Sequence, residues 1–563
     1  MSTSHKTNRF EEFIFDSISH KSRRIAIILV VLALLAGSIF MFPTKLVKAK
    51  MLPGKSTNTF SIYIDTPTGS SISQTTSITQ CVTNIMQKES AVTNMEVFLG
   101  QGSPLDYAGL VKGSGMKQGE QYAEIVINLT DKHSREEASF LMVKRLRPII
   151  QKTCNPLLTG TNIKMIEMPA GPPTLASIVV EVYGNNNKEV IALSKKVASI
   201  LNQTDGLVDV DVMADEVYKK YELVPLKDKI SRSGLTVEQI NKILYLAFEG
   251  MVVASKNTIE LNDQVSIFVS LSDESQVLNE NTLTNLRNKL SSLSLMNKKG
   301  LMIPLTEVVT IKETLSEPTI FHKNLKTMVN VVAETDMVSQ VYPLLAAREV
   351  MIEEFSKNYI VTKVPGITTY MFDLNLEDKV TGKKYLLRWD GEMKVTLDTF
   401  RDLGGAFIAA LILIFLLLVI YYKSFALSGI ILGGSFLSII GVIIGHWFID
   451  LFTEQTFFLT ATSLIGFIAL MGISSRNSLL LIDFAKDLIE KKNIEKHRAI
   501  AIASATRAKP IMLTAIAIIL GSALLASDPV FGGLGIALIS GTIAAVIISL
   551  MFIPVLLANT KAI

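Results

Sequence analysis

The feature that most constrains the fold of this sequence is a set of long apolar segments, one near the N-terminus and five towards the C-terminus. A helix needs about 20 mostly apolar residues to cross roughly 30 Å of hydrocarbon. With 49% hydrophobic residues and a mean hydropathy of +0.38, the chain is too apolar for an ordinary soluble protein. We therefore predict a membrane α-helical bundle of six spans, arranged one plus five. The predicted spans are residues 25–42, 404–422, 425–451, 457–485, 510–526 and 534–558.

The first apolar segment follows basic residues and could therefore be a secretory signal. Its apolar run is longer than a typical signal core, however, and no clear small-x-small cleavage site follows it. We predict a retained membrane anchor. Within residues 1–24, four apolar residues recur at helical spacing, namely Phe10, Phe13, Ile14 and Ile18. They predict an amphipathic helix on the cytoplasmic membrane surface, with a mobile tail as the alternative.

Basic residues predict the direction of the spans, because short cytoplasmic loops carry an excess of Lys and Arg. The stretch between the fourth and fifth spans is strongly basic, whereas residues 450–456 and 527–533 contain no Lys or Arg. Both termini are therefore expected in the cytoplasm, and residues 43–403 outside it. The residues that set this direction are Lys6, Arg9, Lys21, Arg23, Arg24, Lys423, Lys486, Lys491, Lys492, Lys496, Arg498, Arg507, Lys509 and Lys561.

The large polar stretch contains a repeated strand–helix–strand pattern, which predicts two αβ sandwiches. We place the first sandwich at residues 43–174 and the second at 175–403, with an inserted subdomain at about 220–317. The first unit is predicted from segments 60–65, 73–88, 95–99, 123–129 and 135–151. The second is predicted from segments 178–182, 188–202, 208–212, 327–333 and 340–355, and the insertion includes a helix at 236–248 and a strand at 264–271.

The polar stretch offers no constellation of residues suited to catalysis, so we expect no enzyme, cofactor or metal site. His322 is isolated in the sequence and is expected to be structural. Cys81 and Cys154 do not form a disulfide framework by number. They could pair if this stretch lies outside the cytoplasm, but we expect two unpaired core residues. No basic, aromatic-rich patch suggests nucleic acid.

Several segments resemble the C-terminal half of a resistance-nodulation-division (RND) efflux permease of the acriflavine-resistance type. The extracytoplasmic stretches that carry the resemblance are residues 51–53, 65–69, 168–173, 389–392 and 400–403, and the membrane stretches are residues 460–470, 472–478, 483–485, 506–514 and 528–531. The resemblance favours the hydrophobe/amphiphile branch over the heavy-metal branch, because the methionine relay of the latter is not evident.

The resemblance also implies a fold and a set of partners. The two sandwiches would be ferredoxin-like porter subdomains, and the insertion would be of the docking type. The chain would lie in a bacterial inner membrane with its large domain in the periplasm. Its partners would be an N-terminal half-permease, a periplasmic adaptor and an outer-membrane channel in a trimeric assembly, and its substrates would be amphiphilic small molecules.

Arg476 is the strongest candidate for a functional residue, because it lies inside a long apolar run where a charge is costly. The family has a lysine near this position, which responds to a pair of intramembrane aspartates. An arginine keeps its proton, so it can hold or release a carboxylate but does not itself titrate. The alternative is an arginine that reaches the cytoplasmic headgroups.

Four further residues complete the predicted coupling site. Thr514 and Arg507 resemble a relay hydroxyl and a basic residue at its cytoplasmic mouth, although a lone threonine often bonds only to its own helix. Asn477 is a polar neighbour of Arg476. Asp483 is close to the cytoplasmic end of its span, which favours an interfacial role over proton relay.

The aspartate pair that carries protons in this family belongs to the N-terminal half, and this sequence has no such pair. We therefore expect a half-size subunit of a proton-driven multidrug exporter, a proton antiporter, that works with a separately encoded N-terminal half. The alternative is a non-transporting assembly or regulatory subunit, or a remnant of a split gene. The sequence does not specify a substrate.

Overall fold

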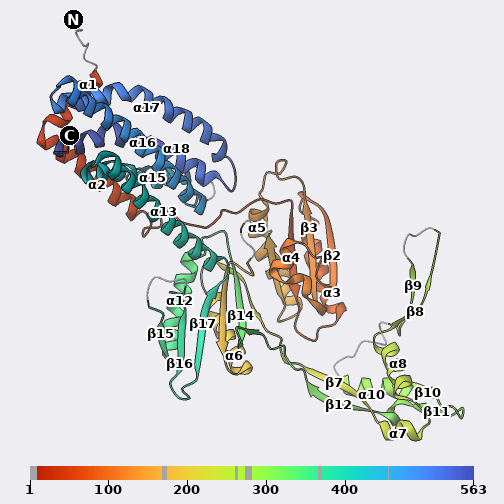
Figure 1. Ribbon diagram of the computed structural model, residues 1–563. Helices are drawn as coiled ribbons and strands as arrows, with labels where there is room; N and C mark the ends of the chain where they lie inside the picture. Colours follow the sequence, from red (N-terminus) through yellow and green to blue (C-terminus); the bar gives the residue numbers. More distant parts are fainter. Residues whose placement is uncertain are drawn as a thin grey trace. The chain divides into compact units, whose positions relative to one another are not determined.

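The computed structural model describes residues 9–167, 171, 174–259, 264–272, 282–365, 370–453 and 456–562. It forms two compact units, one of Met1–Ala214 with Ile320–Ile563 and one of Asp215–Thr319 (Figure 1). The link at 168–173, which carried part of the family resemblance, lies outside the described residues except for Gly171.

The larger unit contains helices that are long and apolar enough to cross a membrane. Within the described ranges there are six such stretches, and the two that are interrupted are each made of consecutive helices. They are α2 (Lys21–Phe40), α13 (Glu392–Tyr422), α14 (Phe425–Phe436) with α15 (Ile439–Asp450), α16 (Ala461–Lys492), α17 (Lys496–Ala526), and α18 (Gly532–Ile547) with the π-turn η3 (Ile548–Phe552) and α19 (Ile553–Asn559).

Two of these helices start well before their apolar runs. Helix α13 begins at Glu392 rather than at Gly404, because its first turns pack into the core of the second sandwich. There the amide of Gln340 donates to the buried Thr396 hydroxyl at 2.8 Å. Helix α17 begins at Lys496, fourteen residues before Pro510, which is accommodated inside the helix. A hydropathy pattern detects apolar content and therefore misses these polar turns.

Small residues bring α15 and α18 close together. A Cβ atom added to Gly441 would lie 2.4 Å from the Cβ of Ala544, and one added to Gly445 would lie 2.2 Å from the Cβ of Ser540. Such contacts between small residues are a common basis of helix association in membranes. The pair therefore forms a tightly packed centre for the bundle, beside α16.

The predicted amphipathic helix forms as α1 (Arg9–Ser19), but its apolar face meets protein. Ile14 and Ile18 are fully buried in a cluster shared with α17 and α19. The Glu11 carboxylate forms an ion pair with Arg498 of α17 at 2.8 Å. The interpretation that this face lies on lipid was therefore wrong for Ile14 and Ile18, because these two side chains pack against the helices of the bundle itself.

The first sandwich is a four-stranded antiparallel sheet in the order β2-β3-β1-β4, with α3 and α5 packed on it (Figure 1). Its β-α-β-β-α-β order is that of a split βαβ fold. Its elements are β1 (Thr59–Asp65), α3 (Ile72–Met86), β2 (Val92–Gln101), α4 (Tyr107–Lys112), η1 (Ser114–Met116), β3 (Gln118–Leu129), α5 (Ser139–Cys154), η2 (Asn155–Leu157) and β4 (Asn162–Glu167).

Cys81 and Cys154 form a disulfide that joins α3 to the end of α5, so the expectation of two unpaired cysteines was wrong. The two residues are 73 positions apart in the sequence, yet their Cα atoms are 5.9 Å apart. They meet because the two helices lie side by side on one face of the sheet. Spacing in the sequence carried no information about this contact.

The second sandwich has a sheet in the order β6-β14-β5-β17-β16-β15, with β13 paired to the start of β14. Helices α6 and α12 contribute to its core. Its elements are β5 (Ile178–Gly184), α6 (Asn187–Asn202), β6 (Leu207–Met213), β13 (His322–Lys323), β14 (Lys326–Thr335), α12 (Val341–Ser356), β15 (Tyr359–Lys363), β16 (Leu374–Asp378) and β17 (Lys384–Asp390).

In the smaller unit, the antiparallel pair β7–β12 joins strands from near the two ends of the inserted segment. A second antiparallel pair, β8–β9, has mostly exposed side chains along both strands. The elements of this unit are β7 (Lys219–Pro225), α7 (Lys227–Arg232), α8 (Val237–Phe248), β8 (Met251–Lys256), β9 (Val265–Val269), α10 (Thr282–Ser292), β10 (Ser294–Met296), β11 (Met302–Pro304), α11 (Leu305–Val308) and β12 (Val309–Leu315).

Candidate functional site

Helix α16 presents one face that does not pack against its own bundle, and Arg476 lies on that face. Residues at three- and four-residue spacing share one side of a helix. Ile465, Ala469, Gly472, Arg476 and Leu480 follow this spacing, and all five are exposed. The opposite side of α16 contributes buried residues to two clusters of the bundle core. A single guanidinium therefore interrupts an otherwise apolar exposed face.

Arg476 makes no hydrogen bond or ion pair with any residue in the part of the chain that the structure describes. Asn477 is the next residue and is buried, because successive helical residues point about 100° apart. The two residues therefore face different sides of α16, and Asn477 does not act as a direct neighbour of the guanidinium.

Asp483 is anchored to α13. The Tyr422 hydroxyl donates to Asp483 Oδ1 at 2.7 Å, and the Tyr421 hydroxyl lies 3.5 Å from Oδ2. This contact ties the cytoplasmic half of α16, in the predicted orientation, to the last turn of α13. Asp483 already has hydroxyl partners.

The two predicted residues of α17 have local partners. The Arg507 guanidinium lies 5.1 Å from the ring centroid of Phe484, a cation–π geometry. The Thr514 hydroxyl donates to the Ile511 carbonyl of its own helix at 2.9 Å. All five predicted residues are described, and no hydrogen bond or ion pair joins any two of them.

Sequence reasoning missed a buried polar centre at His446 of α15. The imidazole is fully buried and lies within a stretch long and apolar enough to span a membrane. Its Nδ1 lies 2.8 Å from the Val442 carbonyl, and its Nε2 lies 2.8 Å from Ser463 Oγ. The available signal was an ionisable residue inside an apolar segment, which by default suggests function.

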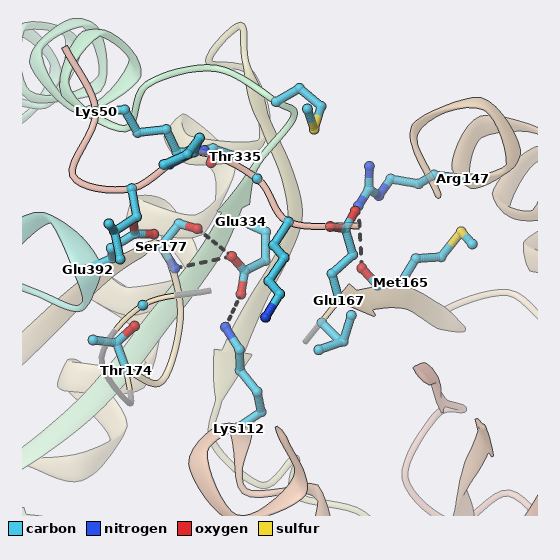
Figure 2. Close-up of a pocket in the computed structure, with 17 residues that line it drawn as sticks. Lys50, Lys112, Arg147, Met165, Glu167, Thr174, Ser177, Glu334, Thr335 and Glu392 are labelled. Carbon is cyan, nitrogen blue, oxygen red and sulfur yellow. Dashed lines mark hydrogen bonds and ion pairs between the residues drawn. The ribbon is translucent and has the colours of Figure 1, made fainter. Parts of the chain in front are cut away.

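A cavity in the αβ region of the larger unit is lined by charged residues from both sandwiches (Figure 2). Lys112 of α4 donates to the Glu334 carboxylate of β14 at 2.5 Å, and the Ser177 hydroxyl donates to the same carboxylate at 2.5 Å. Burial alone would raise the pKa of Glu334, but Lys112 and Ser177 outweigh it and hold that pKa below its ordinary value. This carboxylate therefore stays charged.

Glu167, at the end of β4, lines the same cavity and behaves differently. Burial raises its pKa to about 7, although Arg147 and Lys50 oppose the shift. No hydrogen bond or ion pair to its carboxylate is found among the described residues. The cavity thus combines a carboxylate whose pKa is lowered with one whose pKa is raised to about 7.

A bundle of apolar helices joined to two αβ sandwiches and a small inserted unit defines a multi-span membrane protein with a large αβ domain. The model of the AcrB/AcrD/AcrF family matches residues 2–358 and 372–560. The chain therefore belongs to this family, the RND efflux permeases.

Similar proteins are membrane transporters and related proteins of about twice the length. The chain is 24% identical to the swarming motility protein SwrC of Bacillus subtilis, covering 97% of this chain and 46% of SwrC. It is 20% identical to the multidrug export protein AcrF of Escherichia coli, covering 98% of this chain and 49% of AcrF. It is 21% identical to a toluene efflux pump membrane transporter, TtgB, of Pseudomonas putida, covering 94% and 46%.

Solved structures show the same fold. Two crystal forms of a heavy metal efflux pump superpose with TM-scores of 0.69 and 0.70, at 18% and 17% identity. The matches cover 97% and 98% of this chain and 51% of the pump chain in each crystal form. The chain thus spans about half the length of the relatives that it matches.

Proposed function

We propose that this chain acts as the C-terminal half of a proton-driven RND exporter of amphiphilic compounds, with Arg476 as its contribution to the coupling site. The observation that carries the proposal is an arginine without a described partner on an exposed apolar face of a membrane-length helix. A charge at the centre of a spanning helix costs about 2.5–3.5 kcal/mol on insertion scales, and such residues usually pair. A carboxylate from a second helical bundle would remove this penalty.

The second half would supply the carboxylates, and we expect it on a separate chain. Arg476 does not give up its proton, so it would hold a partner carboxylate while that group is ionised and release it on protonation. The release would let the two bundles shift against each other. Asp483, Arg507 and Thr514 would support this movement through the contacts described above, and Asn477 would do so from its buried position on α16.

The same proposal covers location and assembly. The basic loops favour an inner-membrane protein with both termini in the cytoplasm and both sandwiches, as porter subdomains, in the periplasm. The Cys81–Cys154 disulfide supports an oxidising compartment for the first sandwich. A trimer with a periplasmic adaptor and an outer-membrane channel is the expected assembly, and amphiphilic small molecules are the expected substrates.

The test is to express the full chain with its candidate partner half and to measure drug export from cells together with co-purification of the two chains. Arg476→Ala should reduce export at least tenfold and leave co-purification unchanged. Arg476→Lys should restore part of the export, because a lysine also offers a cation. Lys491→Ala is the matched control, since Lys491 lies on the same helix and is paired at the surface with Asp487.

Full export by Arg476→Ala, together with normal co-purification, would favour the alternative of a non-transporting assembly subunit. Full export by this chain without a partner would contradict the proposal that the acidic groups come from a second half.

A further inference from the structure

His446 lies at the inner end of a continuous chain of hydrogen-bonding groups. The Val442 carbonyl can only accept, so Nδ1 of His446 carries a hydrogen. In the neutral ring, Nε2 is then an acceptor, and the Ser463 hydroxyl at 2.8 Å is its donor. This arrangement leaves one ring nitrogen ready to receive a proton.

The chain continues through three hydroxyl groups at the start of α16. Ser463 Oγ lies 3.0 Å from Thr460 Oγ1, which lies 2.8 Å from Thr462 Oγ1. The Thr462 hydroxyl reaches the Val530 carbonyl at 3.2 Å. The distances between the hydroxyls are within the ordinary range for O–H···O bonds, and the last distance, to the Val530 carbonyl, is slightly longer. Thr460 and Ser463 are held in place by their own helix, because they form its capping box.

The outer end of this series of hydrogen-bonded groups lies at the end of the helical bundle where the polypeptide continues into the sandwiches. Just before α16, the Leu459 backbone N–H donates to the Lys48 carbonyl at 2.9 Å, and the Lys50 N–H donates to the Leu459 carbonyl at 3.1 Å. Thr462 is 8% exposed, whereas Ser463 and His446 are fully buried. Asp528 and Phe531, on either side of Val530 in the loop, are exposed. The chain therefore runs from near the surface to the interior.

We propose that His446 is a proton-binding site of the bundle, loaded from the sandwich end through Thr462, Thr460 and Ser463. A proton from water adds to Thr462 Oγ1, which passes its own hydrogen to Thr460 Oγ1. Thr460 passes its hydrogen to Ser463 Oγ, and Ser463 passes its hydrogen to Nε2. Each hydroxyl gains one O–H bond and loses one, and the net change is one new N–H bond on His446.

The two hydrogen-bonding states use the same side chains, and only the loaded state includes the bond from Thr462 to the Val530 carbonyl. Before transfer, the hydroxyls point towards Nε2. After transfer, the imidazolium donates to Ser463, Ser463 to Thr460, Thr460 to Thr462, and Thr462 to the Val530 carbonyl. The Thr460 N–H and Ser463 N–H occupy one lone pair on each partner hydroxyl in both states. The two states therefore differ in the direction of these hydrogen bonds, in the bond to the Val530 carbonyl and in the added proton on His446.

Among the described residues, no ion pair to an acidic side chain balances the charge on the loaded ring. No ionisable side chain of α2, α16, α18 or the segment before α16 contacts His446 among the described residues. On α15, Asp450 lies one turn further on and accepts the Phe457 N–H at 2.6 Å. The partial positive charge at the start of α16 also repels an imidazolium. Proton binding therefore works against the packing of α15 on the start of α16.

Gly533 of α18 packs directly against the hydroxyls of Ser463 and Thr460. A Cβ added there would lie 2.4 Å from Ser463 Oγ and 2.4 Å from Thr460 Oγ1. A movement of α16 away from α15 would thus also change its contact with α18. In this way external acidity would act on the helix that carries Arg476. That link to transport rests on the proposed function, whereas the proton site itself does not.

The direct test is hydrogen–deuterium exchange of the full chain in its native membrane assembly, with rates corrected for intrinsic pH dependence. Wild type should show at least threefold faster exchange in residues 457–470 at pH 5 than at pH 7.5. His446→Gln keeps hydrogen-bonding groups but does not bind a proton in this range, and it should remove the difference. An unchanged difference in His446→Gln would overturn the proposal.

Thr462→Val tests the loading route at its outer end, where the substitution is nearly isosteric and leaves both bonds of His446 intact. It should slow the pH-induced change at least tenfold without altering exchange at pH 7.5. Ser527→Ala is the matched control, because the Ser527 hydroxyl, in the neighbouring loop, bonds among the described residues only to the Leu524 carbonyl. A response in Thr462→Val equal to that of the control would overturn the route.

Hydrogen–deuterium exchange can be measured without export. The proton site at His446 and the proposed function can therefore be tested independently. Loss of export in Arg476→Ala with an intact pH response in exchange supports both. An intact pH response in an assembly that never exports removes the proposed function and leaves the proton site standing.

Discussion

The guanidinium of Arg147, on α5 of the first sandwich, lies 3.1 Å from the carboxylate of Asp209, on β6 of the second sandwich. The side chains are 10% and 0% exposed, and Asp209 also accepts the Met165 N–H at 3.3 Å. Burial raises the pKa of Asp209, and Arg147 opposes that shift. The two sandwiches are therefore joined by a buried ion pair, and Arg147 also pairs with Asp336, just after the end of β14, at 3.3 Å.

Replacing Arg147 with Met should destabilise the protein by about 3–5 kcal/mol, because Asp209 would remain buried without its partner. The measurement is thermal denaturation of the detergent-solubilised chain. Lys144→Ala is the control, since Lys144 makes an exposed pair with Asp336 at 3.7 Å. Such pairs contribute about 0–1 kcal/mol. Equal effects of the two variants would contradict the importance of the buried pair.

Removing the disulfide with Cys81→Ser and Cys154→Ser should lower the free energy of unfolding by about 4 kcal/mol. The reason is that the unfolded chain gains conformational entropy when a loop of this length is no longer closed. Reducing agent should shift the melting temperature of the wild type towards that of the double variant and leave the variant unchanged. A wild-type protein purified without reductant should show no free thiol, and a reactive thiol at either position would contradict the pairing.

Glu167 should make stability depend on pH between about 4.5 and 7. Its pKa is raised to about 7 in the folded protein, so the folded state binds more protons than the unfolded state in this window. Stability contributed by the protonated form is therefore present at low pH and is lost as the pH rises through 7. Glu167→Gln should melt at a similar temperature at pH 5 and several degrees higher than wild type at pH 8. A constant difference across pH would show that the carboxyl does not titrate there.

Tyr422→Phe should weaken the attachment of α13 to α16, because it removes the hydroxyl that donates to Asp483 at 2.7 Å. A hydrogen bond to a charged group contributes about 1.5–3 kcal/mol. The double variant with Asp483→Asn should be less destabilised than the sum of the single variants. Tyr421→Phe is the matched control, since its hydroxyl lies at 3.5 Å and its side chain is exposed.

The family and the repeated αβ units could be recognised in the sequence because they depend on local patterns. Strands β1 and β5 alternate or are continuously apolar, and α3 and α6 have helical spacing, so both halves of the repeat were predicted. Strands β16 and β17 were missed, because polar and charged residues interrupt their apolar pattern and they are placed only by sheet pairing, of β17 with β5 and of β16 with β17. The disulfide was missed for the same reason, since it depends on helix packing.

The candidate site was predictable one residue at a time but not as an arrangement. Arg476 stood out because a charge in an apolar run is unusual. Its exposure, the Tyr422–Asp483 contact and the burial of Asn477 depend on which helices lie beside α16. His446 could have been found by the rule that selected Arg476. The groups that connect it to the surface are three hydroxyls at the start of α16 and a carbonyl in a distant loop, and no spacing relates them to His446.

Helix α13 is a mechanical connection between the two parts of the larger unit. Its 31 residues make a rod of about 46 Å at 1.5 Å per residue. One end is fixed in the second sandwich at Thr396, and the other is fixed to α16 through Tyr422. A tilt of 5° about one end would displace the other by about 4 Å, given that length. A Cβ atom added to Gly404 or Gly405 would meet nothing within 4 Å. Because helices bend readily at such glycines, we expect α13 to bend here. Replacing both glycines with alanine would make α13 more rigid without adding a contact to another part of the protein.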